Sequence, residues 1–148
     1  MHETVPFYMY TGTMLLFSPL DLSSVFQSAV QLMEDTNQNV FLTGKAGTGK
    51  STLLSYFRKT TKKSTVVLAP TGVSALNVEG QTIHSFFGFK PNVTVDSAKK
   101  SARKTHQPEL YSQLDMLIVD EISMVRADLL DCMDVFMQTV LHNKRPFG

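Results

Sequence analysis

The stretch that decides the fold reads Gly44-Lys45-Ala46-Gly47-Thr48-Gly49-Lys50-Ser51, the pattern G-x-x-x-x-G-K-S. This pattern is typical of a loop that binds phosphate. The glycines at 44, 47 and 49 allow backbone angles at which successive N–H groups turn inward around an anion. We expect Lys50 to contact the β and γ phosphates and Ser51 to ligate Mg²⁺, while the helix that begins there adds the positive end of its dipole. Together with Thr52, these eight residues are the predicted nucleotide-binding loop.

The residues on either side of the loop separate this prediction from a glycine-rich turn that matches the pattern by chance. Residues 39–43 form a short apolar run of strand type, and residues 52–58 have apolar side chains at helical spacing. A phosphate-binding loop requires this order of strand, loop and helix. The sequence therefore predicts an α/β protein that holds a triphosphate and Mg²⁺.

The composition is that of a soluble globular domain. The 148 residues are 43% hydrophobic and 18% charged, and Cys132 is the only cysteine, which excludes an internal disulfide. The cysteine and histidines do not have the spacing of a metal site. Residues 1–20 lack the basic start of a signal peptide and are too short and interrupted to span a bilayer, so no membrane association is expected. These features are compatible with a reducing, intracellular location.

The net charge of +1 conceals an uneven distribution of charge along the chain. Residues 45–104 contain eleven basic residues against only two acidic ones, Glu79 and Asp96. A net charge of +9 in this segment favours polyanionic partners, either a nucleotide or a nucleic acid. The basic run 99–104 is read as an exposed loop or a short basic helix, and either a DNA contact or a solvated surface would explain it.

The remaining pattern predicts a mostly parallel sheet with flanking helices. Buried strands are expected at 65–69 and 116–121, and helices from Ser23 or Ser24 to about Asp35 and over 126–141. The order of strand, helix and strand across residues 39–69 predicts a parallel crossover. Residues 1–21 read as an N-terminal arm of unknown role, or as translated sequence that precedes the domain, and 22–148 as one domain.

A pair of carboxylates ends the predicted strand at 116–121. An aspartate at the end of a strand beside a phosphate-binding loop can hold Mg²⁺, and a second carboxylate can polarise the attacking water. We assign Asp120 to the metal and Glu121 to the base, with Lys50 as the third catalytic residue. The adjacent carboxylates favour ATP hydrolysis, because residues 143–146 read Asn-Lys-Arg-Pro and lack the aspartate of a guanine-reading motif.

Several motifs in order resemble those of the Pif-type DNA helicases, which belong to superfamily one and are related to the RecD-type helicases. The resemblance covers residues 24–148 and rests on the loop 44–51 and on four further segments, which are Ala69-Pro-Thr-Gly-Val-Ser-Ala-Leu-Asn77, Gly80-Gln-Thr-Ile-His-Ser-Phe-Phe87, Val119-Asp-Glu-Ile-Ser-Met-Val125 and Arg145-Pro-Phe-Gly148. It implies a RecA-like P-loop NTPase domain and a 5′ to 3′ ATP-dependent DNA helicase in genome maintenance, such as DNA repair, recombination and telomere maintenance. The location would be cytoplasmic in a bacterium and nuclear or mitochondrial in a eukaryote.

The resemblance also suggests roles for individual residues. Gln27 matches the glutamine that reads adenine, although an exposed helix glutamine would look the same. The segments that grip single-stranded DNA in the family match Pro70, Thr71 and Gly72 in one case and His84, Ser85, Phe86 and Phe87 in the other. Of the two phenylalanines, we expect one to be buried and one, Phe86, to lie near DNA, where a ring can stack on a base.

In the family, Arg145-Pro-Phe-Gly148 leads into the strand that carries the γ-phosphate sensor, and a second RecA-like domain follows. The chain is therefore expected to be an incomplete RecA-like domain that needs the rest of the motor for helicase activity. Because the sensor strand lies in the middle of such sheets, we expect the isolated chain to be marginally stable or prone to aggregation. The alternative is a short protein that binds nucleotide or single-stranded DNA without turnover.

Overall fold

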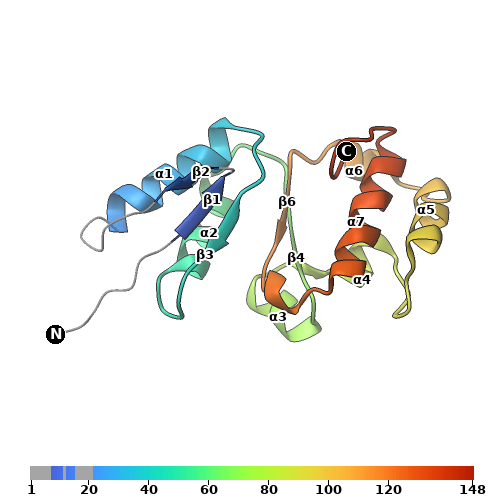
Figure 1. Ribbon diagram of the computed structural model, residues 1–148, viewed down its shortest axis with the longest axis horizontal. Helices are drawn as coiled ribbons and strands as arrows, with labels where there is room; N and C mark the ends of the chain where they lie inside the picture. Colours follow the sequence, from blue (N-terminus) through green and yellow to red (C-terminus); the bar gives the residue numbers. More distant parts are fainter. Residues whose placement is uncertain (1–7, 12, 16–21) are drawn as a thin grey trace. The chain divides into compact units, whose positions relative to one another are not determined.

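A computed structural model describes residues 8–11, 13–15 and 22–148 of the chain. The chain divides into two compact units, residues 1–62 and 63–148. The first unit carries the phosphate-binding loop, and the second carries Asp120 and Glu121. Figure 1 labels the helices and strands of both units.

The first unit contains a small antiparallel sheet. Strand β1 (Tyr8–Thr11) pairs on one edge with β2 (Thr13–Leu15) and on the other with β3 (Phe41–Thr43), the strand that leads into the phosphate-binding loop. Met9 lies opposite Leu42 in this ladder. Part of the predicted N-terminal arm is therefore paired with the strand before the loop, a contact between distant segments that local pattern does not indicate.

Two helices form the core of the first unit. Helix α1 (Leu22–Asp35) and helix α2 (Lys50–Thr60) confirm the predicted helices, with bounds that differ by a few residues. Their buried apolar side chains follow helical spacing and are Val25, Ala29, Met33, Leu53 and Phe57. The carboxylate of Glu34 accepts hydrogen bonds from the Thr61 hydroxyl and the Lys62 N–H, which ties the end of α1 to the segment after α2.

The second unit is built on a parallel sheet of three strands in the order β5-β4-β6. The central strand β4 (Thr65–Ala69) pairs with β6 (Met116–Val119) along most of its length and with the short β5 (Gln81–Thr82) at its carboxyl end. Gly80 is placed immediately before β5, where any Cβ would collide with the Val67 carbonyl oxygen. The close approach of β5 to β4 therefore requires glycine at this position.

Strands β3 and β4 are hydrogen-bonded into different sheets, so neither sheet contains the predicted parallel crossover from β3 to β4. Both edges of β4 are occupied by β5 and β6, which leaves no edge on which β3 could pair. The strand type and position of both segments were predicted correctly, but not their partners.

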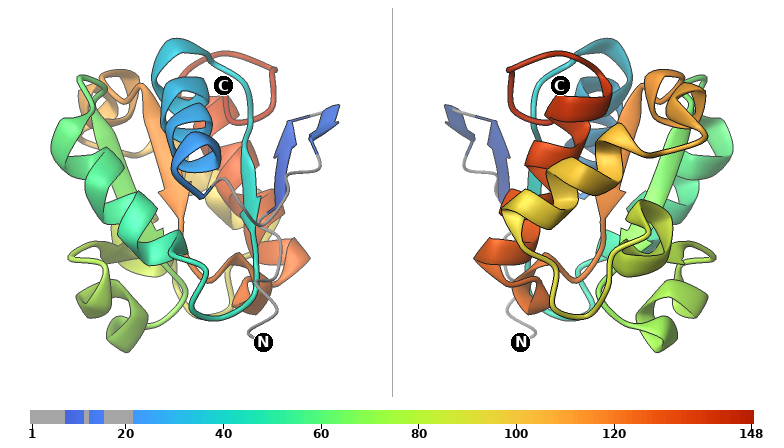
Figure 2. Two further views of the ribbon diagram at one scale, coloured as in Figure 1. Left: turned by 90° about the vertical axis from the view of Figure 1, so that its left-hand side faces the viewer. Right: turned by 90° about the vertical axis from the view of Figure 1, so that its right-hand side faces the viewer.

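Two helices of the second unit form successive layers on one side of the sheet. In chain order, the helices of this unit are α3 (Gly72–Asn77), α4 (Ile83–Phe87), α5 (Val95–Arg103), α6 (Pro108–Ser112), the 3₁₀ turn η1 (Ile122–Met124) and α7 (Ala127–Val140). Figures 1 and 2 show α7 beside the sheet and α5 against α7 on the side away from it. Residues 99–104, left open as loop or helix, lie mostly in α5.

Aromatic residues dominate the core of this unit. Phe136 of α7 contacts three other rings, those of Phe87, Phe89 and Tyr111, at centroid distances of 5.1, 5.7 and 4.9 Å. Cys132 is also buried here, and burial raises the pKa of its thiol, so this cysteine is a core residue of low reactivity. Among the described residues, none of the helices has the length and apolar character that crossing a membrane requires.

Candidate nucleotide and DNA sites

Two glycines of the phosphate-binding loop adopt backbone angles that favour glycine. Gly47 and Gly49 have φ angles of 79° and 87°, the left-handed region that favours glycine. Gly44 is not among the glycines that have a positive φ. It still supplies a carbonyl oxygen that holds the lysine of the loop.

The ammonium group of Lys50 is held by the loop itself. Its Nζ donates hydrogen bonds to the carbonyl oxygens of Gly44, at 2.6 Å, and Lys45, at 2.9 Å. The Thr48 hydroxyl also donates to the Lys45 carbonyl, at 2.9 Å. These bonds hold the ammonium group over the turn. When an anion enters the loop, the ammonium group can exchange these carbonyl oxygens for phosphate oxygens.

The N-terminal end of α2 adds backbone donors to the loop. Gly49 occupies the N-cap position and has no side chain to accept hydrogen bonds from the first turn. The N–H groups at the start of a helix have no acceptor within the helix, so they are available to an anion. The hydroxyl-bearing residues of this turn, Ser51 and Thr52, are exposed. The first unit thus has the donors, charge and access that a phosphate group needs.

Gln27 lies on the exposed side of α1. It lines a surface cavity of about 630 Å³ together with Phe26 and Tyr56, whose rings meet edge to face at 5.5 Å. A neighbouring amide and aromatic rings are groups that an adenine ring can use. The adenine role of Gln27 stays a prediction.

The second unit gathers the other predicted residues at the carboxyl edge of its sheet. Pro70, Thr71 and Gly72 follow β4, and Asp120 and Glu121 follow β6. Since β4 and β6 are parallel, with Leu68 opposite Val119, both segments leave the sheet at the same edge. Helix α4, which carries His84 and Ser85, begins directly after β5 at this edge. Open α/β sheets bind ligands at this edge.

The two carboxylates differ in their backbone setting. The Asp120 N–H donates to the Leu68 carbonyl at 2.9 Å, which continues the ladder between β4 and β6 and fixes Asp120 on the sheet. Glu121 has φ 52° and ψ 42°, a left-handed conformation that is unfavourable for a residue with a Cβ, and its side chain is exposed. The backbone of Asp120 is therefore held on the sheet, while Glu121 lies in a strained turn that directs the chain into η1.

Thr71 has a structural task in addition to its predicted contact with DNA. Its Oγ1 caps α3 by accepting a hydrogen bond from the Ser74 N–H at 3.1 Å, and it lies 2.7 Å from the Ser74 hydroxyl. Ser74 was not predicted as a site residue, although its position three residues after a threonine indicates this cap. Val73 and Leu76 of α3 are 71% and 80% exposed. Their apolar spacing would have suggested burial.

Phe86 does not have the exposure that base stacking requires. Phe86 and Phe87 are 7% and 2% exposed, so the prediction that one of the two rings lies at the surface is wrong. The Phe86 ring packs edge to face against Phe87 and Tyr111, and its carbonyl accepts a hydrogen bond from the Tyr111 hydroxyl at 3.0 Å. Phe86 is a core residue, whereas Ser85 beside it is exposed and His84 is half-buried.

The loop of the first unit and the sheet edge of the second define a P-loop nucleotide-binding protein of the α/β class. The family model for PIF1-like helicases matches residues 21–148. The chain therefore belongs to the PIF1-like helicase family, and its fold is a fragment of the RecA-like fold of that family.

Individual relatives agree with this assignment. The chain is 38% identical to the ATP-dependent DNA helicase PIF1 of Saccharomyces cerevisiae over 88% of its length, and 35% identical to the ATP-dependent DNA helicase Pif1 of Bdellovibrio bacteriovorus over 87%. It spans only 16% and 30% of those two proteins.

Solved structures show the same likeness. A structure of Bacteroides sp Pif1 in complex with ADP-AlF4 matches 86% of this chain with a TM-score of 0.73 and 38% identity. A complex of Bacteroides Pif1 with ADP-AlF3 and single-stranded DNA matches 86% with a TM-score of 0.72 and 37% identity. The chain covers 30% of each of those structures.

Proposed function

We propose that this chain is the N-terminal part of the first motor domain of an ATP-dependent DNA helicase, which translocates 5′ to 3′ on single-stranded DNA. The names of its relatives and the nucleotide and DNA complexes of Bacteroides Pif1 support this proposal. The observation that carries it is the phosphate-binding loop, in which Gly47 and Gly49 adopt left-handed angles and Lys50 is held over the turn.

In this proposal the loop binds the triphosphate of ATP. The backbone N–H groups of residues 44–52 surround the phosphates, and Lys50 exchanges its carbonyl partners for the β and γ phosphate oxygens. The exposed Ser51 hydroxyl and the Asp120 carboxylate are oxygen ligands of the kind that Mg²⁺ prefers. When bound, the metal neutralises charge on the transferred phosphoryl group, and Glu121 orients and deprotonates the attacking water.

The DNA contacts in this proposal lie at the sheet edge of the second unit. Pro70, Thr71 and Gly72 after β4, and His84 and Ser85 after β5, provide hydroxyl, imidazole and backbone groups for the sugar–phosphate chain. A second RecA-like domain, supplied by the remainder of the motor, is the expected partner for closure around ATP. Such a protein would act on DNA in the cytoplasm of a bacterium or in the nucleus or mitochondria of a eukaryote.

The test is DNA-stimulated ATP hydrolysis by the protein that joins this chain to a second motor domain. Lys50→Ala and Glu121→Gln are each expected to lower the rate by about a hundredfold or more, as for the loss of a charge-stabilising donor or a general base. Lys59→Ala, at the other end of α2, and Glu79→Gln, at another glutamate with positive φ, are matched controls expected to keep the rate. Hydrolysis at the original rate by Glu121→Gln would refute its role as the base.

A nucleotide- or DNA-binding protein without turnover remains the second candidate. The loop geometry supports its nucleotide-binding form, because binding a nucleotide phosphate needs only the first unit's donors and charge. ATP binding without hydrolysis in the protein that includes a second motor domain would favour this candidate.

A further inference from the structure

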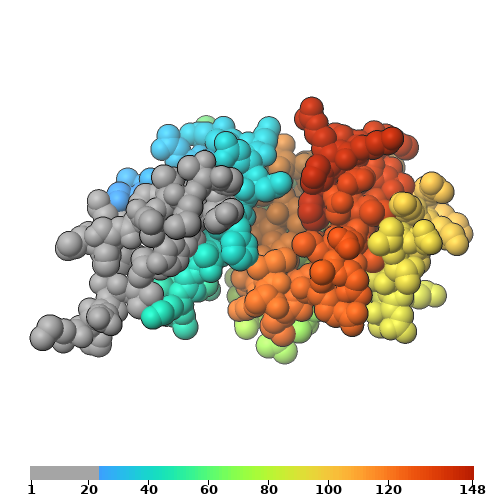
Figure 3. Space-filling model, in the orientation of Figure 1, coloured from blue at the N-terminus to red at the C-terminus, as the bar shows by residue number. Residues whose placement is uncertain are grey.

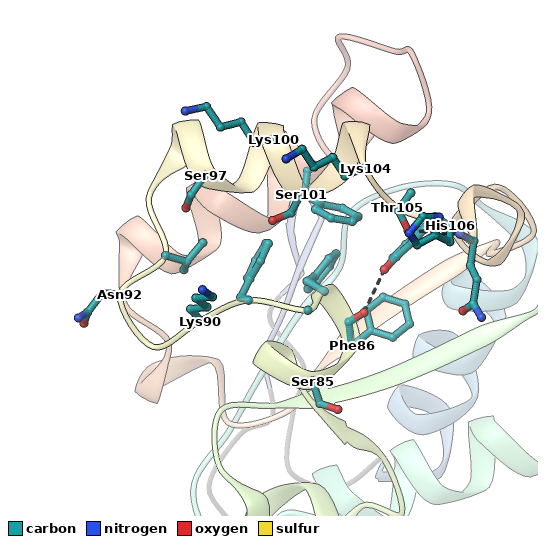
Figure 4. A pocket seen from close by; sticks show the side chains of 17 residues that line it. Ser85, Phe86, Lys90, Asn92, Ser97, Lys100, Ser101, Lys104, Thr105 and His106 are labelled. Atoms are coloured by element: carbon teal, nitrogen blue, oxygen red, sulfur yellow. Dashed lines mark hydrogen bonds between the residues drawn. The ribbon is translucent and has the colours of Figure 1, made fainter.

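The second unit has a groove between α5 and the segment that follows α4. Its volume is about 780 Å³. Figure 4 shows Lys100 on α5 and Lys104 directly after it along one rim, Lys90 and Asn92 on the opposite segment, and Ser85 at one end. In the space-filling view of Figure 3, α5 and the segment before it lie at the surface of this unit. The segments that form its rims are therefore accessible to a ligand.

The charge of the groove has one sign. Four of its lining residues carry basic side chains, which are Lys90, Lys100, Lys104 and His106, and none of its lining residues is acidic. Hydroxyl and amide groups from Asn92, Ser97, Ser101, Thr105 and Gln107 complete the polar lining. Cations interspersed with neutral hydrogen-bonding groups suit a chain of phosphates, since each phosphate offers both charge and acceptor oxygens.

The cationic side chains at the C-terminal end of α5 lie on two different faces of the helix. Ser97, Lys100, Ser101 and Lys104 recur at helical spacing and line the groove, while Ala98 and Ala102 are buried in the core. Lys99 and Arg103 are equally exposed but do not line the groove. Helix α5 and its C-cap residue thus provide two cations that line the groove and two that do not.

The floor of the groove gives rigidity and little stacking area. Its aromatic side chains, Phe86, Phe87, Phe89, Tyr111 and Phe136, are each at most 7% exposed. Bases cannot stack on rings that are buried to this extent. A ligand would therefore contact the polar side chains of the rim through its phosphate backbone. The groove is continuous with the proposed DNA site, because Ser85 belongs to both.

From these observations we propose that the groove binds the phosphate backbone of the single-stranded DNA that passes Thr71 and Ser85, and so extends the DNA path of this unit along α5. The inference rests on the proposed function. It assigns direct phosphate contacts to Lys100 and Lys104, with Lys90 on the opposite rim, and none to Lys99 and Arg103.

Two double variants of equal charge test the assignment. Binding of fluorescent oligothymidine is measured by anisotropy over a range of salt concentrations for the 148-residue chain, for Lys100→Gln/Lys104→Gln and for Lys99→Gln/Arg103→Gln. Losing two phosphate contacts is expected to reduce the salt slope by about 1.4, and affinity at 0.1 M salt by about 25-fold if the 1 M intercept is unchanged. The control pair should keep the wild-type slope.

Lysine acetylation followed by mass spectrometry provides an independent measurement on the unmodified sequence. Oligothymidine is expected to protect Lys100 and Lys104 from acetylation and to leave their neighbour Lys99 reactive. Circular dichroism of both double variants checks that α5 is intact, which is expected because all four side chains are exposed.

An equal loss of DNA affinity in both double variants would overturn the proposal in favour of nonspecific electrostatic attraction. Equal protection of Lys99 and Lys100 from acetylation would do the same. Unchanged binding by Lys100→Gln/Lys104→Gln would overturn it while leaving DNA binding at the sheet edge intact. Poly-glutamate that binds with the same dependence on Lys100 and Lys104 would overturn the assignment to DNA. Wild-type chain that binds no oligothymidine would overturn both this inference and the DNA part of the proposed function, whereas ATP hydrolysis is tested separately.

Discussion

The hydrogen bond from Tyr111 to Phe86 ties α6 to the end of α4, and its removal should destabilise the second unit measurably. The Tyr111 hydroxyl lies 3.0 Å from the Phe86 carbonyl oxygen in a buried setting. Tyr111→Phe keeps the ring, with its contacts to Phe86 at 5.3 Å and Phe136 at 4.9 Å, and deletes only the hydroxyl. The carbonyl left without that donor should cost about 1–2 kcal/mol in the free energy of unfolding.

The assay is urea denaturation followed by circular dichroism. In a thermal scan, the same loss of unfolding free energy corresponds to a fall in Tm of about 4–16 °C for a domain of the size of the second unit, residues 63–148. Tyr56→Phe is the matched control, because Tyr56 is 50% exposed and its ring contact with Phe26 does not involve the hydroxyl. It should change stability by less than about 0.5 kcal/mol. A Tyr111→Phe variant as stable as the control would refute the reasoning.

The same tyrosine predicts a dependence on alkaline pH. Burial raises the pKa of Tyr111 above its ordinary value of 10.0, and a hydrogen bond with Thr105 offsets this in part. A folded-state pKa above the unfolded value means that the neutral phenol stabilises the fold below pH 10, and that this stability is lost as the pH rises through the folded-state pKa. Tyr111→Phe should therefore remove part of the decline in stability above pH 10, and an equally steep decline in the wild type and the variant would contradict the argument.

Three further predictions concern single positions. Gly80→Ala should destabilise the second unit by about 1–3 kcal/mol in urea denaturation, because its Cβ meets the Val67 carbonyl, while Gly72→Ala, with open space around its Cβ, should not. Thr94 Oγ1 caps α5 by accepting a hydrogen bond from the Ser97 N–H, so Thr94→Ala should lower the free energy of unfolding by about 1 kcal/mol and Thr94→Asp by much less. Equal losses of stability in the two variants would argue against the cap. Glu79→Gly and Glu121→Gly should each raise stability by up to about 1 kcal/mol by relieving positive φ, but only Glu121→Gly should abolish ATP hydrolysis in a protein with a second motor domain.

Features that depend on local sequence were predictable. The phosphate-binding loop, the helices on each side of it and the strands at 65–69 and 116–119 follow from glycine spacing and apolar periodicity. The helix over the basic run was also within reach, because Thr94 and Ser97 form a reciprocal cap at the start of α5. Local hydrogen-bonding chemistry determines these elements, so one segment is enough to recognise each.

Features that depend on distant partners were not predictable in the same way. Phe86 is buried because Tyr111, 25 residues further along, covers its ring and binds its carbonyl. The pairing of β1 with β3 joins residues more than thirty positions apart, and the short β5 has too few residues to show a period. In each case the environment of a side chain or strand edge is set by a segment whose position the local pattern does not contain.

Glu121 shows how a departure from local preference can indicate function. A turn with φ 52° directly after the half-buried strand β6 favours glycine or asparagine, yet the chain has a glutamate there whose side chain is exposed at the carboxyl edge of the sheet. Glu79 has a similar φ of 50° but follows α3 and lies outside the segments that leave β4 and β6. Strain alone therefore does not identify a catalytic residue. Two features together support a catalytic role for Glu121: its strained backbone and its position next to Asp120. The backbone of Asp120 is itself held on the sheet by the hydrogen bond to the Leu68 carbonyl.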